Sequence, residues 1–520
     1  MYKFFLCWRY LLTRYIALAS VVSVMLGVAT MIVVNAIMLG FTSEMKDRIH
    51  GILADVIFHT HDTYKGFPDY ERHRAEIFRV AGDLIEELTP TVVTRGMLIY
   101  QVDGIGTPIT FEVDVVGVDV LTQGNVSRIA EYLQHPANRN QLSFDLREGG
   151  YDVQGSGRDG PIREQMRYAG WEHRRWRAAQ LRWQRELQAQ QNPPIPIQPF
   201  SGEEGGQPVD PFAGLTRADM PVFDPATEQH TGIIIGIGAA LWRRVREPCP
   251  ETSETVVRDY LNLIPGDDIS LFFPTADMPP RFQGDSFTVV DLYESKMVDY
   301  DRRLVFVPID RLQRLRGMFD ADSGTFTITQ ILIKAKPGVD INVLRDRLQD
   351  AFPPHYNIRT WRDDQEMMLN AIHTELAMLN VLLFLIFMVA GFGILAIFYM
   401  IVVEKQKDIG ILKALGAGGG GIMQIFLYYS LLLGTVGAVL GLGLGLLMVE
   451  YIREIAYVLS FILQREIFSP EMYSFYEIPT IVDIPTVIGI ITGAIFIAVS
   501  AGVLPALRAA RVHPVETLRS

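Results

Sequence analysis

Residues 403–417 read VEKQKDIGILKALGA and lie between two long apolar runs. No charged residue occurs between Glu375 and Glu404, and none occurs between Lys413 and Glu450. Each run exceeds the roughly 20 apolar residues that cross the hydrocarbon of a bilayer as a helix. The charged stretch between them therefore predicts a hairpin that lies in water at one face of a membrane.

The hairpin has the pattern of a small amphipathic helix. Ile411, Leu412 and Leu415 share one face, because residues three or four positions apart are neighbours on a helix surface. Gly416 is expected to end the helix. The polar residues expected to stay hydrated are Lys405, Lys407, Asp408 and Lys413. Since a hairpin in water needs no apolar stripe, we expect this one to dock against another protein.

The composition is typical of a membrane protein with a large water-exposed part. The 520-residue chain is 49% hydrophobic and 20% charged, with a mean hydropathy of +0.18. A net charge of −12 argues against nucleic acid as a partner. The two cysteines, Cys7 and Cys249, fall on opposite sides of the membrane in the topology below, so no disulfide between them is expected.

Four uncharged runs predict four transmembrane helices. The first run is longer than the roughly 7–15 residues of a signal-peptide core, and Lys3, Arg9 and Arg14 before it favour a cytoplasmic start. The predicted spans are 16–41, with a stalk to about residue 52, then 363–403, beginning as a second stalk, then 422–449 and 484–507. Residues 1–15, 404–421 and 508–520 are then cytoplasmic, and residues 53–362 and 450–483 are extracytoplasmic.

Residues 53–362 are predicted to form a large α+β domain. Helices are expected at about 72–88, 309–316 and 342–351. Strands are expected at 56–58, 92–102, 109–118, 267–272, 287–292, 304–307, 327–335 and 356–361. The predicted fold class is therefore an α-helical membrane protein with four transmembrane helices and a large α+β extracytoplasmic domain.

Residues 136–228 differ in composition from the rest of that domain. Gly-rich and Pro-rich pieces flank a stretch rich in arginine, tryptophan and glutamine, residues 162–191. This stretch is predicted to be a helix carrying Trp171, Trp176 and Trp183. Such a helix lies on anionic lipid headgroups or forms a solvated insertion arm, and both possibilities stay open. We expect much of the 136–228 insert to be mobile.

The third predicted span is rich in glycine. Gly437, Gly441 and Gly445 recur every four residues, which is the small-xxx-small pattern of closely packed membrane helices. These glycines are expected to allow close helix contact, within this chain or with a second copy. The glycines from Gly416 to Gly421 are interpreted as a flexible joint between hairpin and span.

A search for catalytic, metal and nucleotide motifs is negative. Residues 418–421 are all glycine but lack the lysine of a phosphate-binding loop, and Leu241 replaces the last glycine of a dinucleotide fingerprint that would begin at Gly236. His59 and His61 could share a strand face, but no third metal ligand is evident near them. Asn35, inside the first span, is expected to face other protein. The chain is therefore predicted not to be an enzyme by itself, and to hold no cofactor or metal.

Two motifs resemble a known family. Residues 404–417 are similar to the cytoplasmic segment between the second and third spans of the FtsX/MacB/LolC-LolE permeases, which belong to ABC transporters of the mechanotransmitting type. Residues 504–519, LPALRAARVHPVETLR, are similar to the carboxy-terminal motif of that family. The first span and parts of residues 230–361 resemble the lipoprotein-releasing branch, LolC/LolE. The 136–228 insert has no counterpart in the resemblance.

The resemblance implies a role for the hairpin. It would be a coupling helix that docks into a groove of a partner ABC ATPase subunit, and that subunit would bind ATP and Mg. The residues implied in coupling are Glu404, Lys405, Asp408, Ile409, Ile411, Leu412 and Leu415. Because only residues 1–15 precede the first span, the ATPase is expected on a separate chain, in contrast to MacB.

The resemblance also implies partners and a place. We expect a dimer with a second copy or a paralogue, in a bacterial inner membrane, with the large domain in the periplasm. Lipoproteins would be released from the outer leaflet to a periplasmic carrier. Two alternatives stay open: efflux of small molecules or peptides through a tripartite machine, and FtsX-like signalling that controls a cell-wall hydrolase.

Overall fold

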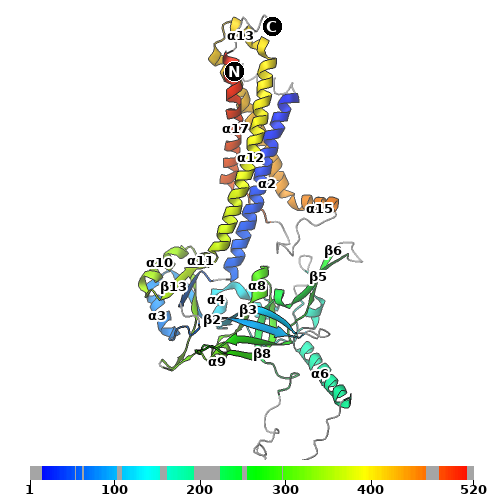
Figure 1. Ribbon diagram of the computed structural model, residues 1–520, viewed down its shortest axis with the longest axis vertical. Helices are drawn as coiled ribbons and strands as arrows, with labels where there is room; N and C mark the ends of the chain where they lie inside the picture. Colours follow the sequence, from blue (N-terminus) through cyan, green and yellow to red (C-terminus); the bar gives the residue numbers. More distant parts are fainter. Residues whose placement is uncertain are drawn as a thin grey trace, which may run out of the picture. The chain divides into compact units, whose positions relative to one another are not determined.

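The computed structural model describes residues 15–52, 54–60, 64–101, 108–152, 161–191, 223–248, 255–295, 297–321, 323–463 and 479–511. The chain divides into two compact units (Figure 1). Residues Met1–Asp47 and Gln365–Ser520 form one, which we call the helical unit, and residues Arg48–Asp364 form the other, the sheet unit.

Among the described residues, four helices are long and apolar enough to cross a membrane, in agreement with the four predicted spans. They are α2 (Tyr15–Ile52), α12 (Glu366–Glu404), α14 (Gly419–Glu450) and α17 (Ile484–Arg511). Two shorter helices are α13 (Gln406–Ala414), between α12 and α14, and α15 (Ile452–Leu463), after α14. The chain is therefore a membrane protein with a large additional unit that is not predominantly helical.

The sheet unit is built on one mixed sheet with strand order β13-β1-β12-β2-β3-β9-β4-β8-β7. The strands are β1 (Val56–Thr60), β2 (Ile85–Tyr100), β3 (Ile109–Val118), β4 (Thr231–Gly236), β7 (Asp268–Pro274), β8 (Phe282–Tyr293), β9 (Leu304–Pro308), β12 (Gln330–Ala335) and β13 (Tyr356–Thr360). Neighbours are antiparallel, except that β3 runs parallel to β9 and β4 parallel to β8. Two small antiparallel pairs are separate from it: β5 (Leu241–Pro248) with β6 (Thr255–Leu261), and β10 (Phe319–Asp320) with β11 (Thr325–Phe326).

The long strand β2 allows the sheet to close on itself. One edge of β2 has two partners. The first half of that edge pairs with β12, and the second half pairs with β7, with Leu98 opposite Leu271. Strands β2, β3, β9, β4, β8 and β7 therefore form a closed ring, whose buried core includes Leu98, Val115, Ile233, Phe287 and Val305. Closure removes the exposed strand edges that an open sheet would leave.

Helices cover the remaining faces of the sheet. Helices α3 (Tyr70–Ala81) and α10 (Ile341–Ala351) pack near β1, β2 and β13, and α9 (Ile309–Arg316) packs against β2, β3 and β9. The other helical segments are α4 (Gln123–Val126), η1 (Arg128–Tyr132), α5 (Pro136–Asn140), η2 (Glu164–Tyr168), α6 (Trp171–Gln191), α7 (Ile237–Ala240), α8 (Val298–Arg303) and α11 (Trp361–Asp364).

Several predicted boundaries were wrong. The predicted helix at 72–88 ends at Ala81, and residues from Ile85 onward belong to β2, because they pair with β12. Residues 419–421 are not a joint but form the first turn of α14. The predicted loop at 450–483 begins with α15, and residues 464–478 lie outside the described residues.

The prediction of a largely mobile 136–228 insert was wrong for its described parts. Leu142, Phe144 and Leu146 are buried against the outer face of the ring, where they contact a cluster containing Ile234 and Val290. In β4, Ile233 and Ile235 belong to the core cluster that includes the ring strands, whereas Ile234 faces the insert, because successive side chains of a strand point to opposite faces. Residues 153–160 and 192–222 of the insert lie outside the described residues.

Two buried arginines of the insert add ionic contacts. Arg163 donates to Asp259 at 3.1 Å and to Glu294 at 2.7 Å. Burial opposes its charge, but Glu294 and Asp259 hold the pKa of Arg163 above its ordinary value. Arg174, at the start of α6, donates to Asp268 at 2.6 Å and to the Gly266 carbonyl at 3.2 Å. The described part of the insert through Arg174 is thus packed into the folded unit, whereas Trp176 and Trp183 further along α6 are exposed.

We predict that Arg174→Met destabilises the sheet unit, because the Gly266 and Glu228 carbonyls lose their guanidinium donor and the Asp268 carboxylate keeps only its hydrogen bond from Thr288. The expected loss is about 2 kcal/mol, the usual range for hydrogen bonds to charged groups. Chemical denaturation of the purified chain, followed by tryptophan fluorescence, measures it. The matched control is Arg175→Met, whose ion pair with Glu148 is exposed and should contribute little. Equal denaturation midpoints for the two variants would contradict this role for Arg174.

Candidate functional site

Helix α13 is the folded form of the charged stretch at 403–417. Glu404 is the last residue of α12, and Lys405 turns the chain into α13. The Lys405 ammonium group and the Asp408 carboxylate form an ion pair at 2.6 Å within the first turn. Among the residues implied in coupling, these three are therefore placed at the corner between α12 and α13.

Gly416 ends α13 as predicted. It has a φ of +95°, a conformation that favours glycine. The amide of Gly416 donates to the Lys413 carbonyl and that of Ala417 to the Leu412 carbonyl, both at 3.0 Å. This pair of hydrogen bonds is a Schellman motif, which satisfies the last carbonyl groups of a helix. The turn after α13 is therefore hydrogen-bonded and defined.

The structure divides the apolar residues implied in coupling into one that is buried and three, the predicted stripe, that are exposed. Ile409 is only 3% exposed and belongs to the core of the helical unit, together with Val402 and Ile422. In contrast, Ile411 is 48%, Leu412 43% and Leu415 81% exposed. We call these three exposed side chains the coupling patch. Ile409 attaches α13 to the chain's own helices, so it offers no surface to a partner in this conformation.

The end of α17 holds α13 from the other side. The Lys413 ammonium group donates to the Ala510 carbonyl at 2.6 Å, where a cation is favourable because a helix carboxy terminus is partly negative. The guanidinium group of Arg508 lies over the Tyr399 ring of α12, 4.7 Å from its centroid, and donates to the Tyr399 hydroxyl. The described part of the 504–519 motif thus connects α12, α13 and α17; residues 512–519 lie outside the described residues.

The glycines singled out in the third span face α2. A Cβ added at Gly437 would lie 2.7 Å from Val24 Cβ, and one at Gly441 would lie 2.7 Å from the Met25 carbonyl oxygen. At Gly445 the nearest atoms belong to Ala29 and Ile32, at 3.2 Å. Each glycine therefore lets α14 approach the backbone or Cβ atoms of α2 within the same chain.

Sequence reasoning missed a second stripe of small residues, on α17. Ala494, Ala498, Gly502 and Ala506 are buried and recur every four residues. A Cβ at Gly434 of α14 would lie 2.8 Å from Ala498 Cβ, and one at Gly502 would collide with Ser430. The four-residue spacing of small residues was the available signal. Helix α14 thus contacts α2 with one face and α17 with another.

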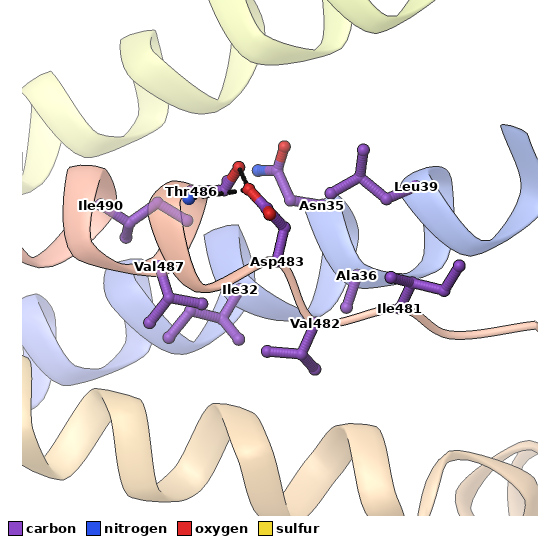
Figure 2. A pocket seen from close by; sticks show the side chains of 10 residues that line it. All are labelled: Ile32, Asn35, Ala36, Leu39, Ile481, Val482, Asp483, Thr486, Val487 and Ile490. Carbon is purple, nitrogen blue, oxygen red and sulfur yellow. Dashed lines mark hydrogen bonds between the residues drawn. The ribbon is translucent and has the colours of Figure 1, made fainter. Parts of the chain in front are cut away.

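A hollow lies between α2 and the start of α17 (Figure 2). Asp483 caps α17 by accepting from the Thr486 amide at 3.0 Å and from its hydroxyl at 2.6 Å. Asn35 donates to the Met31 carbonyl at 2.9 Å and lines the hollow beside Asp483 and Thr486, so it faces other protein groups. The hollow has room for about one water molecule. It is too small to bind a substrate.

A third cluster lies inside the sheet unit, at the end of α2. His50 and Asp55 are hydrogen-bonded at 2.5 Å, and the His50 ring stacks on Trp361 at 5.4 Å. The Trp361 amide donates to the Asp55 carbonyl at 3.2 Å, and Asp55 also accepts from Ala335 of β12 at 2.8 Å. The end of α2 and the start of α11, which precedes α12, are therefore joined at one residue, Asp55, whose carboxylate contacts His50 and whose main-chain carbonyl accepts from Trp361.

The structure supports no metal site among the residues that it describes. No group of three or more His, Cys, Asp or Glu side chains there could hold an ion. His59 lies in β1, with its ring near the Thr60 carbonyl at 3.2 Å. His61, Cys7 and Cys249 lie outside the described residues.

We predict that Gly441→Val destabilises the helical unit, because the new side chain would collide with Met25 and Val28 of α2. Overpacking of this kind costs about 1–3 kcal/mol. Thermal unfolding of the chain purified in detergent, followed by circular dichroism, measures the effect. Gly443→Val is the matched control two residues away, since a Cβ at Gly443 has no atom within 4 Å. Similar losses for both variants would show that helix propensity, not packing, explains the glycines.

Comparisons with known proteins agree with the resemblance seen in the two motifs. Residues 380–514 match the family model described as FtsX-like permease C-terminal, a segment that contains the second part of α12 and all of α13, α14 and α17. The lipoprotein-releasing system transmembrane protein LolC of Xylella fastidiosa is 27% identical over 45% of this chain and 55% of its own length. LolE of Haemophilus influenzae is 25% identical over 35% of this chain and 42% of its own length.

A further relative is the macrolide export ATP-binding/permease protein MacB of Bdellovibrio bacteriovorus, 26% identical over 42% of this chain and 32% of its own length. The chain spans about half the length of the LolC proteins that it matches, and less of LolE and MacB. The matched family segment contains the coupling patch and the packed glycines of α14. Residues 380–514 are therefore similar to FtsX-like permease domains, and the predicted resemblance to the FtsX/MacB/LolC-LolE permeases is confirmed.

Proposed function

We propose that this chain is the permease subunit of an ABC transporter of the mechanotransmitting type. It works in a bacterial inner membrane, with α13 in the cytoplasm and the sheet unit in the periplasm. A separate ATPase subunit binds ATP and Mg, and a second permease copy or a paralogue completes the dimer. The charge bias of the sequence, basic before the first span and in the hairpin, supports this orientation.

The coupling patch is the observation that carries the proposal. Ile411, Leu412 and Leu415 are exposed on a helix whose other side is held by Ile409 and Lys413. An apolar surface that is exposed in water indicates an interaction site. Because α13 is anchored to both α12 and α17, a force applied to the patch is transmitted to both helices and is not absorbed by the turn.

Two helices can carry that motion out of the membrane. Helices α2 and α12 contain 38 and 39 residues, which correspond to about 57 Å each at 1.5 Å per residue. The hydrocarbon core is only about 30 Å thick. Each helix therefore extends well beyond the bilayer, and the cluster of His50, Asp55 and Trp361 supports the view that both move the sheet unit together.

The substrate that fits this machine best is a lipoprotein of the outer leaflet. Its acyl chains hold it in the membrane by about 0.8 kcal/mol for each buried CH₂ group, so that extraction needs an energy source. The similarity to LolC and LolE favours this substrate.

Efflux of small molecules or peptides is the second candidate, favoured by the similarity to MacB. It would use the same coupling patch but would need a periplasmic adaptor instead of a lipoprotein carrier. A protein that only signals to a cell-wall hydrolase would bind that hydrolase and release no lipoprotein.

We predict that Leu412→Glu prevents association with the ATPase subunit, because a charge would enter an apolar groove. The expected loss is at least about tenfold in affinity, or 1.4 kcal/mol. Co-purification of the ATPase with the tagged permease measures it. The matched control is Leu121→Glu, a change at an exposed leucine of the sheet unit. If the ATPase co-purifies equally with the Leu412→Glu variant, the assignment of the coupling patch is wrong.

We also predict ATP-dependent release of a lipoprotein from vesicles that contain the permease, its co-purifying ATPase and a triacylated lipoprotein. Transfer to a soluble carrier protein is measured by sedimentation of the vesicles. The Leu412→Glu variant should release no lipoprotein above the level without ATP. Hydrolysis of ATP without any release would contradict the substrate but leave the permease assignment standing, and would favour efflux or signalling.

A further inference from the structure

Helix α15 begins where α14 ends, and one residue, Tyr451, lies between them. The Tyr451 amide donates to the Leu447 carbonyl at 3.1 Å, and the Ile455 amide donates to the Tyr451 carbonyl at 3.0 Å. Hydrogen bonds therefore continue through the corner, although α15 points away from the direction of α14 (Figure 1). The position of α15 is set by the end of α14.

The residues of α15 are divided between an apolar and a polar side. Ile455, Leu459 and Ile462 follow one another at spacings of four and three, which places them on one helical face. Leu463 follows Leu459 by four positions and widens that face. Glu454 lies outside that face, about 100° from Ile455 and about 140° from Leu459 around the helix axis. This is the pattern of an amphipathic helix.

The residues that the structure describes leave most of the apolar face of α15 exposed. None of its residues belongs to the buried core of the helical unit, within the part of the chain that the structure describes. Leu459 is 43%, Ile462 67% and Leu463 58% exposed. Such a face needs an apolar environment from outside the helical unit.

The end of α14 indicates what that environment is. Glu450 is the first charged residue after the apolar run that starts at Ile422, so it marks the edge of the hydrocarbon. Tyr451 beside it is typical of the membrane–water interface. Leu447 and Tyr451 are exposed and lead from α14 toward α15, so the lipid-facing surface of α14 continues into the apolar face of α15.

We propose that α15 lies in the interface of the bilayer at the end of α14. Leu459, Ile462 and Leu463 contact the acyl chains, and Glu454 lies among the headgroups and water. The occupant of the apolar face is lipid, because that face continues a surface that already lies in lipid. The proposal rests on α14 crossing a membrane and does not depend on the substrate or on the ATPase. In this position α15 holds the end of α14 at a fixed depth.

The test uses the full chain with Cys7→Ser and Cys249→Ser, reconstituted in vesicles of phosphatidylethanolamine and phosphatidylglycerol. Leu459→Cys and Ile462→Cys each place a single thiol on the apolar face, and Glu454→Cys is the matched control on the polar side. Each thiol carries an environment-sensitive nitrobenzoxadiazole dye. The emission wavelength and the quenching by doxyl-labelled phospholipid are measured.

The expected result is blue-shifted emission and strong lipid quenching at positions 459 and 462, with weak quenching at 454. Equal quenching at all three positions would overturn the proposal, since it would remove the sidedness of the helix. Blue-shifted emission without lipid quenching at 459 and 462 would also overturn it, because a protein surface, such as a second copy, would then cover the face. No ATPase or lipoprotein takes part, so failure of the proposed transport function would not affect this outcome.

Discussion

The close approach of α14 to its neighbours is the contact on which the helical unit depends. In lipid, helices gain nothing from leaving water, so association depends on van der Waals packing at short range. Gly441 brings the α14 backbone against the Met25 carbonyl of α2, and Gly434 brings it against Ala498 of α17. Because two faces of α14 carry small residues, this helix packs closely against both α2 and α17.

That packing determines how α13 is held. A short turn that contains Gly416 connects α13 to α14. Helix α17 contacts α13 through the hydrogen bond from Lys413 to the Ala510 carbonyl. The ordered first turn of α14 at residues 419–421 leaves little freedom at this corner. The coupling patch therefore lies on a helix that contacts both α12 and α17, as the proposed transfer of motion from a partner to these helices requires.

The sheet unit buries apolar side chains both inside its ring of strands and on part of the outer face of that ring. Its ring of strands is filled by apolar side chains, and the insert covers the outside of β4 and β8 through Leu142, Phe144 and Leu146. Strand β4 is therefore buried on both faces, which explains its uninterrupted run of isoleucines, Ile233 to Ile235. That run was the available sign that the insert packs on the sheet, and sequence reasoning did not use it.

Sequence alone determined what local chemistry can determine. Charge-free runs longer than a bilayer predicted four long apolar helices, Gly416 predicted the end of α13, and the spacing of Gly437, Gly441 and Gly445 predicted close helix contact. The two motifs pointed to the permease family that the comparisons confirm. Each of these signals lies within a few residues of the chain and needs no distant partner.

Only the tertiary structure decided which apolar side chains are buried and which are exposed to a partner. Ile409 and Leu415 are equally apolar in the sequence, yet one is buried among α12 and α14 residues and the other is exposed, because burial depends on neighbours from remote segments. Distant neighbours also explain two other outcomes. Residues 85–88 form a strand because β12 supplies their hydrogen-bond partners. Arg163 and Arg174 of the insert are buried because Asp259, Glu294 and Asp268 supply the opposite charges. Local pattern states what a segment can form, whereas distant contacts select among those possibilities.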